Sequence, residues 1–200
     1  PLTTLGTFLL WFGWFGFNGF SQLAMGTFDD VNSISKIAVN THLAGAAGTV
    51  AGAAITRLLG GKTDVIMMLN GALAGLVAIT AEPLTPSPIL AIFIGAIGAI
   101  IMYFGTKMLE KFGLDDVVGA IPVHMFAGIF GTLVVPISNG ETSFGTQLVG
   151  TVSVVVFSFV LSYIVFSSLK ATVGLRISKA AEKLGTDKAE IGVVAYSIRD

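Results

Sequence analysis

Charged residues in this chain are separated by long apolar stretches, and this pattern constrains the fold more than any other feature of the sequence. None of residues 117–140 is charged, and His124 is the one titratable side chain in that stretch. Only 12% of all residues are charged, against about 25% in a typical soluble domain. Such runs are typical of helices that cross a bilayer. We therefore predict an all-α polytopic membrane protein.

Apolar segments between polar loops predict six transmembrane helices. They cover residues 3–25, 34–59, 65–81, 88–109, 116–135 and 146–169. On this division, residues 1–172 form the transmembrane domain and residues 173–200 form a polar C-terminal tail. The chain starts at Pro1 rather than at a methionine, so we expect further sequence upstream.

The basic residues predict the orientation of these spans. All but one of the 11 Lys and Arg residues fall on the same side, and they are Arg57, Lys62, Lys107, Lys111, Lys170, Arg176, Lys179, Lys183, Lys188 and Arg199. Lys36 alone falls on the other side, with Asp29, Asp30, Glu82 and Glu141. By the positive-inside rule, the protein lies in a cell membrane with its C-terminal tail in the cytoplasm.

Composition and motifs argue against several classes of function. The net charge of −1 gives no indication of nucleic-acid binding, and the absence of cysteine excludes disulfides, thiolate metal sites and cysteine nucleophiles. His42 and His124 have no acidic partner in their own spans, and the sequence holds no Walker loop or dinucleotide fingerprint. We predict that the chain is not an enzyme and holds no metal or cofactor.

His124 is the candidate functional residue that stands out from the sequence alone. Counted from Asp116, the expected start of its helix, it lies about 13 Å along the axis, near the midplane of a core about 30 Å thick. A titratable group at that depth is costly, so it normally faces an aqueous path or the interior of a bundle. The alternative is a packing histidine that is hydrogen-bonded to a neighbouring helix.

The first span is rich in aromatic residues, and it contains a second candidate site. Phe17 and Ser21 are four residues apart, so they share one helical face near the outer end of the span. A ring face and a hydroxyl at that point can hold a small cation. The alternative is that the rings fill a core or form an interfacial belt.

Small residues recur at helical spacing, and we interpret them as packing positions. The pairs are Gly48 with Gly52, Gly71 with Gly75, Gly95 with Ala99, and Gly128 with Gly131. Small side chains allow membrane helices to approach closely.

Several longer motifs carry a resemblance to a known family. They are residues 13–21 (GWFGFNGFS), 40–44 (NTHLA), 70–80 (NGALAGLVAIT), 115–128 (DDVVGAIPVHMFAG) and 172–176 (TVGLR). In order and spacing they resemble the ammonium transporter (Amt/Mep/Rh) family, in its Amt branch, from Leu5 to about Tyr196. The resemblance implies transport of ammonium or ammonia across the lipid bilayer.

The family fold has eleven transmembrane helices, built from two five-helix repeats of inverted topology, and it assembles as a homotrimer with one pore per subunit. The chain resembles helices six to eleven of this fold, which are the second repeat and the last helix. A cytoplasmic start of the chain, expected from six spans and a cytoplasmic tail, agrees with this assignment.

The resemblance also implies roles for four residues. Phe17 resembles one of two phenyl rings stacked across the outer pore entrance, and Ser21 resembles the hydroxyl of the external ammonium site. His124 resembles the second histidine of the pair that lines the pore, whose first member belongs to the helix before this chain. Trp14 matches a family tryptophan that supports the pore wall. His42 stands where many relatives have asparagine, and we interpret it as a polar packing residue.

The sequence departs from the family pattern at two places. Gly119 stands where many members carry an acidic residue, and the tail has Ile191, Gly192 and Val193 where His-Gly-Glu is usual. The family tail supports regulation by trimeric PII signalling proteins, so the altered tail puts that partner in doubt.

Three functions remain open at this stage. The first is an ammonium transporter or channel, and the second is an ammonium sensor with a signalling domain beyond residue 200. The third is a truncated or structural half-protein without activity.

Overall fold

The computed structural model describes residues 1–195, which fall into two compact units, residues 1–152 and residues 153–195. Every regular element in residues 1–195 is helical, which confirms the predicted all-α class.

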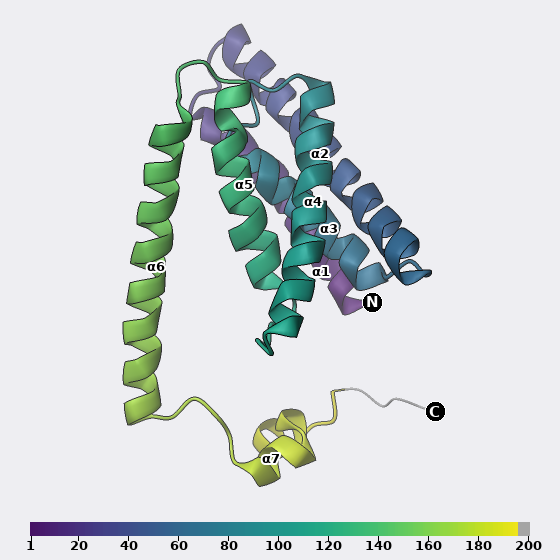
Figure 1. Cartoon of the computed structure of the whole chain (residues 1–200), viewed down its shortest axis with the longest axis vertical. Coiled ribbons are helices and arrows are strands. Elements are labelled where there is room, and N and C mark those ends of the chain that lie inside the picture. Colours follow the sequence, from purple (N-terminus) through teal and green to yellow (C-terminus); the bar gives the residue numbers. More distant parts are fainter. Residues whose placement is uncertain (196–200) are drawn as a thin grey trace. The chain divides into compact units, whose positions relative to one another are not determined.

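The first unit contains five helices packed together (Figure 1). They are α1 (Leu2–Gly19), α2 (Phe28–Gly60), α3 (Val65–Thr80), α4 (Pro88–Lys111) and α5 (Ala127–Val134). A 3₁₀ turn (Phe20–Gln22) follows α1, a π-helical turn (Ile121–Phe126) precedes α5, and a 3₁₀ turn (Val135–Ile137) follows it. The long helix α6 (Phe144–Thr172) begins in the first unit and continues into the second.

Three of the described helices, α2, α4 and α6, are long and apolar enough to cross a membrane. The segments Val65–Thr80 and Ile121–Ile137 are also apolar but shorter. Helix α3 has 16 residues and α1 has 18, which correspond to lengths of about 24 and 27 Å.

Side-chain caps determine where these helices begin. At α2, Thr27 Oγ1 accepts a hydrogen bond from the Asp30 backbone N–H, and the Asp30 carboxylate accepts one from the Thr27 backbone N–H. This reciprocal pair is a capping box. Helix α2 therefore starts at Phe28, before the expected residue 34. Ser87 caps α4 with a single hydrogen bond, because its Oγ accepts from the Leu90 backbone N–H, and Pro88 is the first helical residue.

Glycines bring the backbones of α2, α3 and α4 close together. A methyl group added at Gly48 would collide with the backbone carbonyl of Gly71, and one added at Gly95 would collide with Ala44. A methyl group at Gly52 would lie 2.8 Å from the Met67 carbonyl oxygen. These contacts confirm that the spaced glycines of α2, α3 and α4 are packing positions.

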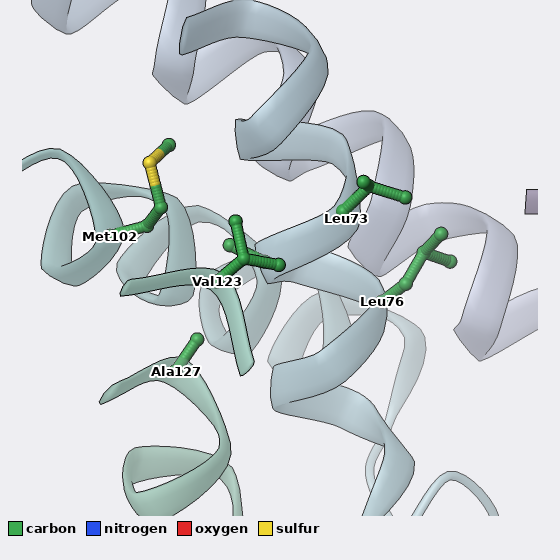
Figure 2. Packing of buried hydrophobic residues seen from close by; sticks show 6 residues of the cluster. Leu73, Leu76, Met102, Val123 and Ala127 are labelled. Atoms are coloured by element: carbon green, nitrogen blue, oxygen red, sulfur yellow. The ribbon is translucent and has the colours of Figure 1, made fainter. Parts of the chain in front are cut away.

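Helix α3 lies at the centre of the core. Leu73 and Leu76 of α3 pack with Met102 of α4, Val123 of the π turn and Ala127 of α5 (Figure 2). The other end of α3 contributes to a second buried cluster, which consists of Ala44, Ala78, Ile79, Ala91 and Ile94. Helix α3 is thus the element on which α1, α4 and α5 are positioned.

The second unit ends in a short polar tail. It contains α7 (Lys179–Leu184) and a π-helical turn (Asp187–Ile191), and Ser178 caps α7. Arg176 forms an ion pair with Glu182. The Asp187 carboxylate accepts a hydrogen bond of 3.0 Å from the Ala195 backbone N–H, which closes the end of the tail into a loop. Tyr196, the last residue of the family resemblance, lies outside the described residues.

The loop closed by Asp187 is expected to depend on pH. The Ala195 backbone N–H lowers the pKa of the Asp187 carboxyl below its usual value, with further help from the Lys188 N–H. Because the folded-state pKa is lowered, the contact is complete above the ordinary aspartate pKa, and it is lost as the pH falls through the lowered one. The Ala195 amide resonance in an NMR titration of the protein should report this midpoint. Asp187→Asn should abolish the titration, and an unshifted midpoint would contradict the prediction.

Candidate functional site

A pocket of about 580 Å³ opens between α1, α3 and α5. Its walls are mostly apolar, with a few polar groups, and they consist of Leu9, Leu10, Gly13, Trp14, Phe17, Val77, Thr80, Ala81, His124, Gly128 and Thr132. Three of the four predicted site residues, Trp14, Phe17 and His124, therefore line one cavity. An apolar pocket with a few convergent polar groups is the usual form of a small-molecule site.

The indole ring of Trp14 lies in the pocket wall, next to the rings of Phe17 and His124. Its indole Nε1–H donates a hydrogen bond of 2.7 Å to Thr80 Oγ1, and the Thr80 hydroxyl donates in turn to the Leu76 carbonyl, also at 2.7 Å. The indole ring lies nearly parallel to the His124 ring, with centroids 6.5 Å apart, and it meets the Phe17 ring edge-on at 6.1 Å. The tether to α3 thus orients the indole beside both of the other site rings.

Thr80→Val is expected to destabilise the protein by about 1–3 kcal/mol, because it leaves the half-buried Trp14 N–H without an acceptor. Thr80→Ser keeps the hydroxyl and should stay within about 1 kcal/mol of the parent. Thermal unfolding of the purified protein in detergent measures both variants. Equal losses in the two variants would show that the hydroxyl bond is unimportant.

Phe17 and Ser21 occupy different positions relative to the pocket. The Phe17 side chain is 65% exposed and lines the pocket. Ser21 lies in the 3₁₀ turn after α1, where its hydroxyl donates to the Phe17 carbonyl at 2.9 Å. The two residues are neighbours along one face, as their spacing predicted, but the structure does not place Ser21 among the residues that line this pocket.

His124 lies closer to the start of its helix than the sequence suggested. The Asp116 carboxylate accepts hydrogen bonds from the backbone N–H groups of Ala120 (2.9 Å) and Ile121 (2.7 Å). Asp116 is therefore a cap that precedes the helix, and the expected helix start at Asp116 was wrong. The His124 imidazole is exposed in the pocket and has no hydrogen bond to any of residues 1–195, so the structure gives no support to the alternative of a hydrogen-bonded packing histidine.

Asn70 of α3 sets the path of the chain into the His124 helix. Pro122 has no N–H, so it cannot donate the helical hydrogen bond to the Val118 carbonyl. The Asn70 side-chain amide donates to that carbonyl instead, at 3.0 Å. Gly119 has φ of +75°, and a Cβ there would lie 2.6 Å from Asn70 Nδ2. The positive φ and this contact both favour glycine at position 119.

Sequence reasoning did not identify Asn70 or Thr80 as site-forming residues. Both lie at positions of α3 that are otherwise surrounded by apolar side chains, and a polar residue in such a run was the available signal.

His42 does not line the pocket. Its ring lies 5.5 Å from the Trp11 ring and 6.2 Å from the Phe15 ring, on the α2-facing side of α1. Residues 1–195 contain no group of three or more His, Cys, Asp or Glu side chains that could hold a metal ion.

Comparison with known proteins gives the family. The model of the Ammonium Transporter Family matches residues 1–196. The chain belongs to the ammonium transporter family. It is 42% identical to ammonium transporter Amt2 of Archaeoglobus fulgidus over 213 residues, which cover 96% of this chain and 44% of that protein.

Solved structures of the ammonium transporter family agree with this assignment. A sensor Amt protein superposes with a TM-score of 0.86 at 35% identity, covering 95% of this chain and 49% of the other. Mep2 of Candida albicans superposes with a TM-score of 0.81 at 26% identity, covering 94% of this chain and 45% of the other.

Family membership and the apolar helices identify a multi-pass membrane protein. The chain spans less than half the length of the relatives described above.

Proposed function

We propose that this chain supplies one half of an ammonium-conducting pore. The observation that supports this most strongly is the convergence of two aromatic rings and one imidazole in a single apolar pocket. In the proposed arrangement the chain is the second five-helix repeat and the last helix of an eleven-helix subunit. The missing first repeat closes the pocket into a pore at the repeat interface.

Ammonium is recruited at the outer mouth of this pore. The faces of Phe17 and Trp14 attract the cation through their ring quadrupoles, which is worth about 0.5–2 kcal/mol per ring depending on desolvation. The Ser21 hydroxyl already donates to the Phe17 carbonyl, so its oxygen lone pairs remain free to accept a hydrogen bond from ammonium.

The ion loses its proton as it passes into the apolar part of the pocket. Burying an ion without a partner costs far more than burying a neutral polar molecule, so the walls favour ammonia over ammonium. His124 then offers a hydrogen-bonding nitrogen to ammonia, and a second histidine from the missing half completes the pair. An imidazole titrates near neutral pH, which suits it to relay the released proton.

The remaining features of the proposed assembly are those that the family resemblance implies. The subunits form a homotrimer in the cell membrane, residues 1–172 form the transmembrane part, and residues 173–200 form a cytoplasmic tail. The tail is the contact region for a PII-type regulator, although residues 191–193 differ from the family pattern at that contact.

The current evoked by an ammonium jump on proteoliposomes that hold the full-length protein tests this proposal. We expect a saturable signal for ammonium and none for equal jumps of sodium or potassium. Folded protein that gives no ammonium-dependent signal, in either the current or internal-pH readout, would overturn the transport proposal.

A sensor is the second candidate, and one comparison favours it. The protein that superposes with a TM-score of 0.86 is described as a sensor Amt protein. In this alternative the same pocket binds ammonium and the tail transmits its occupancy to a signalling domain beyond residue 200. Binding of ammonium without flux, together with an ammonium-dependent activity of such a domain, would select the sensor.

A further inference from the structure

A second polar side chain, that of Thr132, lies on the same face as His124 in the wall of the pocket between α1, α3 and α5. His124, Gly128 and Thr132 follow one another at intervals of four residues, and all three line the pocket. The two polar side chains are therefore about 12 Å apart along the axis.

Gly128 keeps the wall between these two side chains smooth. A Cβ at Gly128 would lie 3.5 Å from Val77 Cγ1, which is an ordinary contact distance, so close packing does not require a glycine there. Gly131 differs, because a methyl group at that position would collide with the backbone of Ala78. The contact of Gly131 with Ala78 also places Thr132 near the end of α3 that carries Thr80.

The Thr132 hydroxyl is unpaired, in contrast to other threonines inside the helices. Four of these donate to the carbonyl of the residue four positions earlier, and they are Thr49, Thr56, Thr80 and Thr106. Thr132 Oγ1 makes no hydrogen bond to any of residues 1–195, and it is not one of the polar atoms that are buried without a partner. The Thr132 hydroxyl is therefore accessible.

The other hydroxyl of the pocket wall is already engaged. Thr80 Oγ1 accepts from the Trp14 indole N–H and donates to the Leu76 carbonyl. The side-chain groups of the pocket that are free to bind a small polar ligand are thus the His124 imidazole and the Thr132 hydroxyl. A hydroxyl both donates and accepts, so it can accept an N–H of ammonium or ammonia.

We propose that Thr132 is a specificity-determining residue that binds the substrate before it reaches His124. This inference rests on the proposed function and on the predicted orientation, in which the Thr80 end of α3 is the outer end. The Thr132 hydroxyl accepts an N–H of ammonium at the point where the wall becomes apolar. Methylammonium has a methyl group in place of one N–H, and a methyl group cannot make this bond. The hydroxyl therefore favours ammonium over methylammonium.

Uptake of ammonium and of methylammonium by proteoliposomes that hold the full-length protein tests this inference. The half-saturating concentration is measured for each ion. Thr132→Val replaces the hydroxyl by a methyl group of similar size. It should raise the half-saturating concentration of ammonium about three- to tenfold, because one hydrogen bond to the substrate is lost. That of methylammonium should change by less than about twofold, because its methyl group gains an apolar contact.

Three further variants separate substrate binding from a structural role. Thr132→Ser keeps the hydroxyl and should keep the preference for ammonium within about twofold of the parent. Thr132→Ala removes the hydroxyl without adding bulk and should lower the preference as Thr132→Val does. Thr49→Val is the matched control, because Thr49 is a half-buried helical threonine outside the pocket. It should leave both half-saturating concentrations within about twofold of the parent.

The outcomes distinguish this inference from the transport proposal on which it rests. An active parent whose preference for ammonium is unchanged in Thr132→Val and Thr132→Ala would overturn the role of Thr132 and leave transport standing. Equal losses for both ions in all three Thr132 variants would also overturn it, because they would indicate a structural role. A folded parent that takes up neither ion would overturn the transport proposal and the role of Thr132 with it.

Discussion

His124→Ala is expected to lower the ammonium-evoked signal of the full-length protein by about tenfold or more. The pocket around His124 is mostly apolar, and no other imidazole of residues 1–195 lines it. In the proposed mechanism, removing the ring takes away a hydrogen-bond partner of the desolvated substrate. A lost partner of this kind costs about 1–3 kcal/mol, which corresponds to a factor of about 5 to 150.

His42→Ala is the matched control for this experiment, because His42 is the second histidine of the chain and lies outside the pocket. It should leave the signal within about twofold of the parent. His124 is exposed, so its removal should leave no cavity in the core, and size-exclusion chromatography should show an unchanged assembly. The same signal from both alanine variants would remove His124 from the proposed mechanism.

Gly48→Val is expected to have the largest effect on stability of any single change considered, about 3 kcal/mol or more. A Cβ at this position would collide with the Gly71 carbonyl and would lie 3.1 Å from the Gly75 Cα. These are backbone atoms of α3, so no change of rotamer can relieve the clash. Overpacking a core commonly costs about 1–3 kcal/mol, and a clash with backbone lies at the upper end or beyond. Thermal unfolding in detergent measures this loss.

Gly60→Ala serves as the control on the same helix. No heavy atom lies within 4 Å of a Cβ built there, so we expect a change of less than about 1 kcal/mol. Destabilisation by Gly60→Ala as large as that of Gly48→Val would show that the close approach of α2 to α3 does not explain the result, because alanine has a higher helix propensity than glycine.

The positions of the helices could be predicted from the sequence, but several of their boundaries could not. Each predicted apolar segment overlaps a helix of the structure, but the end of α1 and the start of α2 each differ from the expected residue by six positions. In the structure α2 starts at Phe28, before the expected residue 34, and the His124 helix starts after Asp116. In both cases a carboxylate, Asp30 or Asp116, takes part in capping the helix, and capping depends on local geometry that composition does not report.

Part of the candidate site was also accessible from the sequence. Sequence patterns and the family resemblance predict Trp14, Phe17 and His124 as site residues, and the structure places all three around one pocket. The sequence does not predict the hydrogen bonds that position these side chains, because those bonds join residues that are distant in the sequence. Thr80 lies 66 residues from Trp14, and Asn70 lies 48 residues from Val118. Hydrophobic periodicity reports which face of a helix is apolar, but it does not pair a polar side chain with a distant partner.

The two hydrogen bonds of α3 have a consequence for how the chain can vary. Asn70 holds the start of the His124 helix near one end of α3, and Thr80 holds Trp14 at the other end. One helix, α3, therefore fixes the distance between the indole ring of Trp14 and the imidazole ring of His124. The loop after Gln22 can change in length or sequence while the spacing of the two rings stays the same. The loop after Lys111 is constrained at Asp116, Val118 and Gly119, because these residues set the start of the His124 helix.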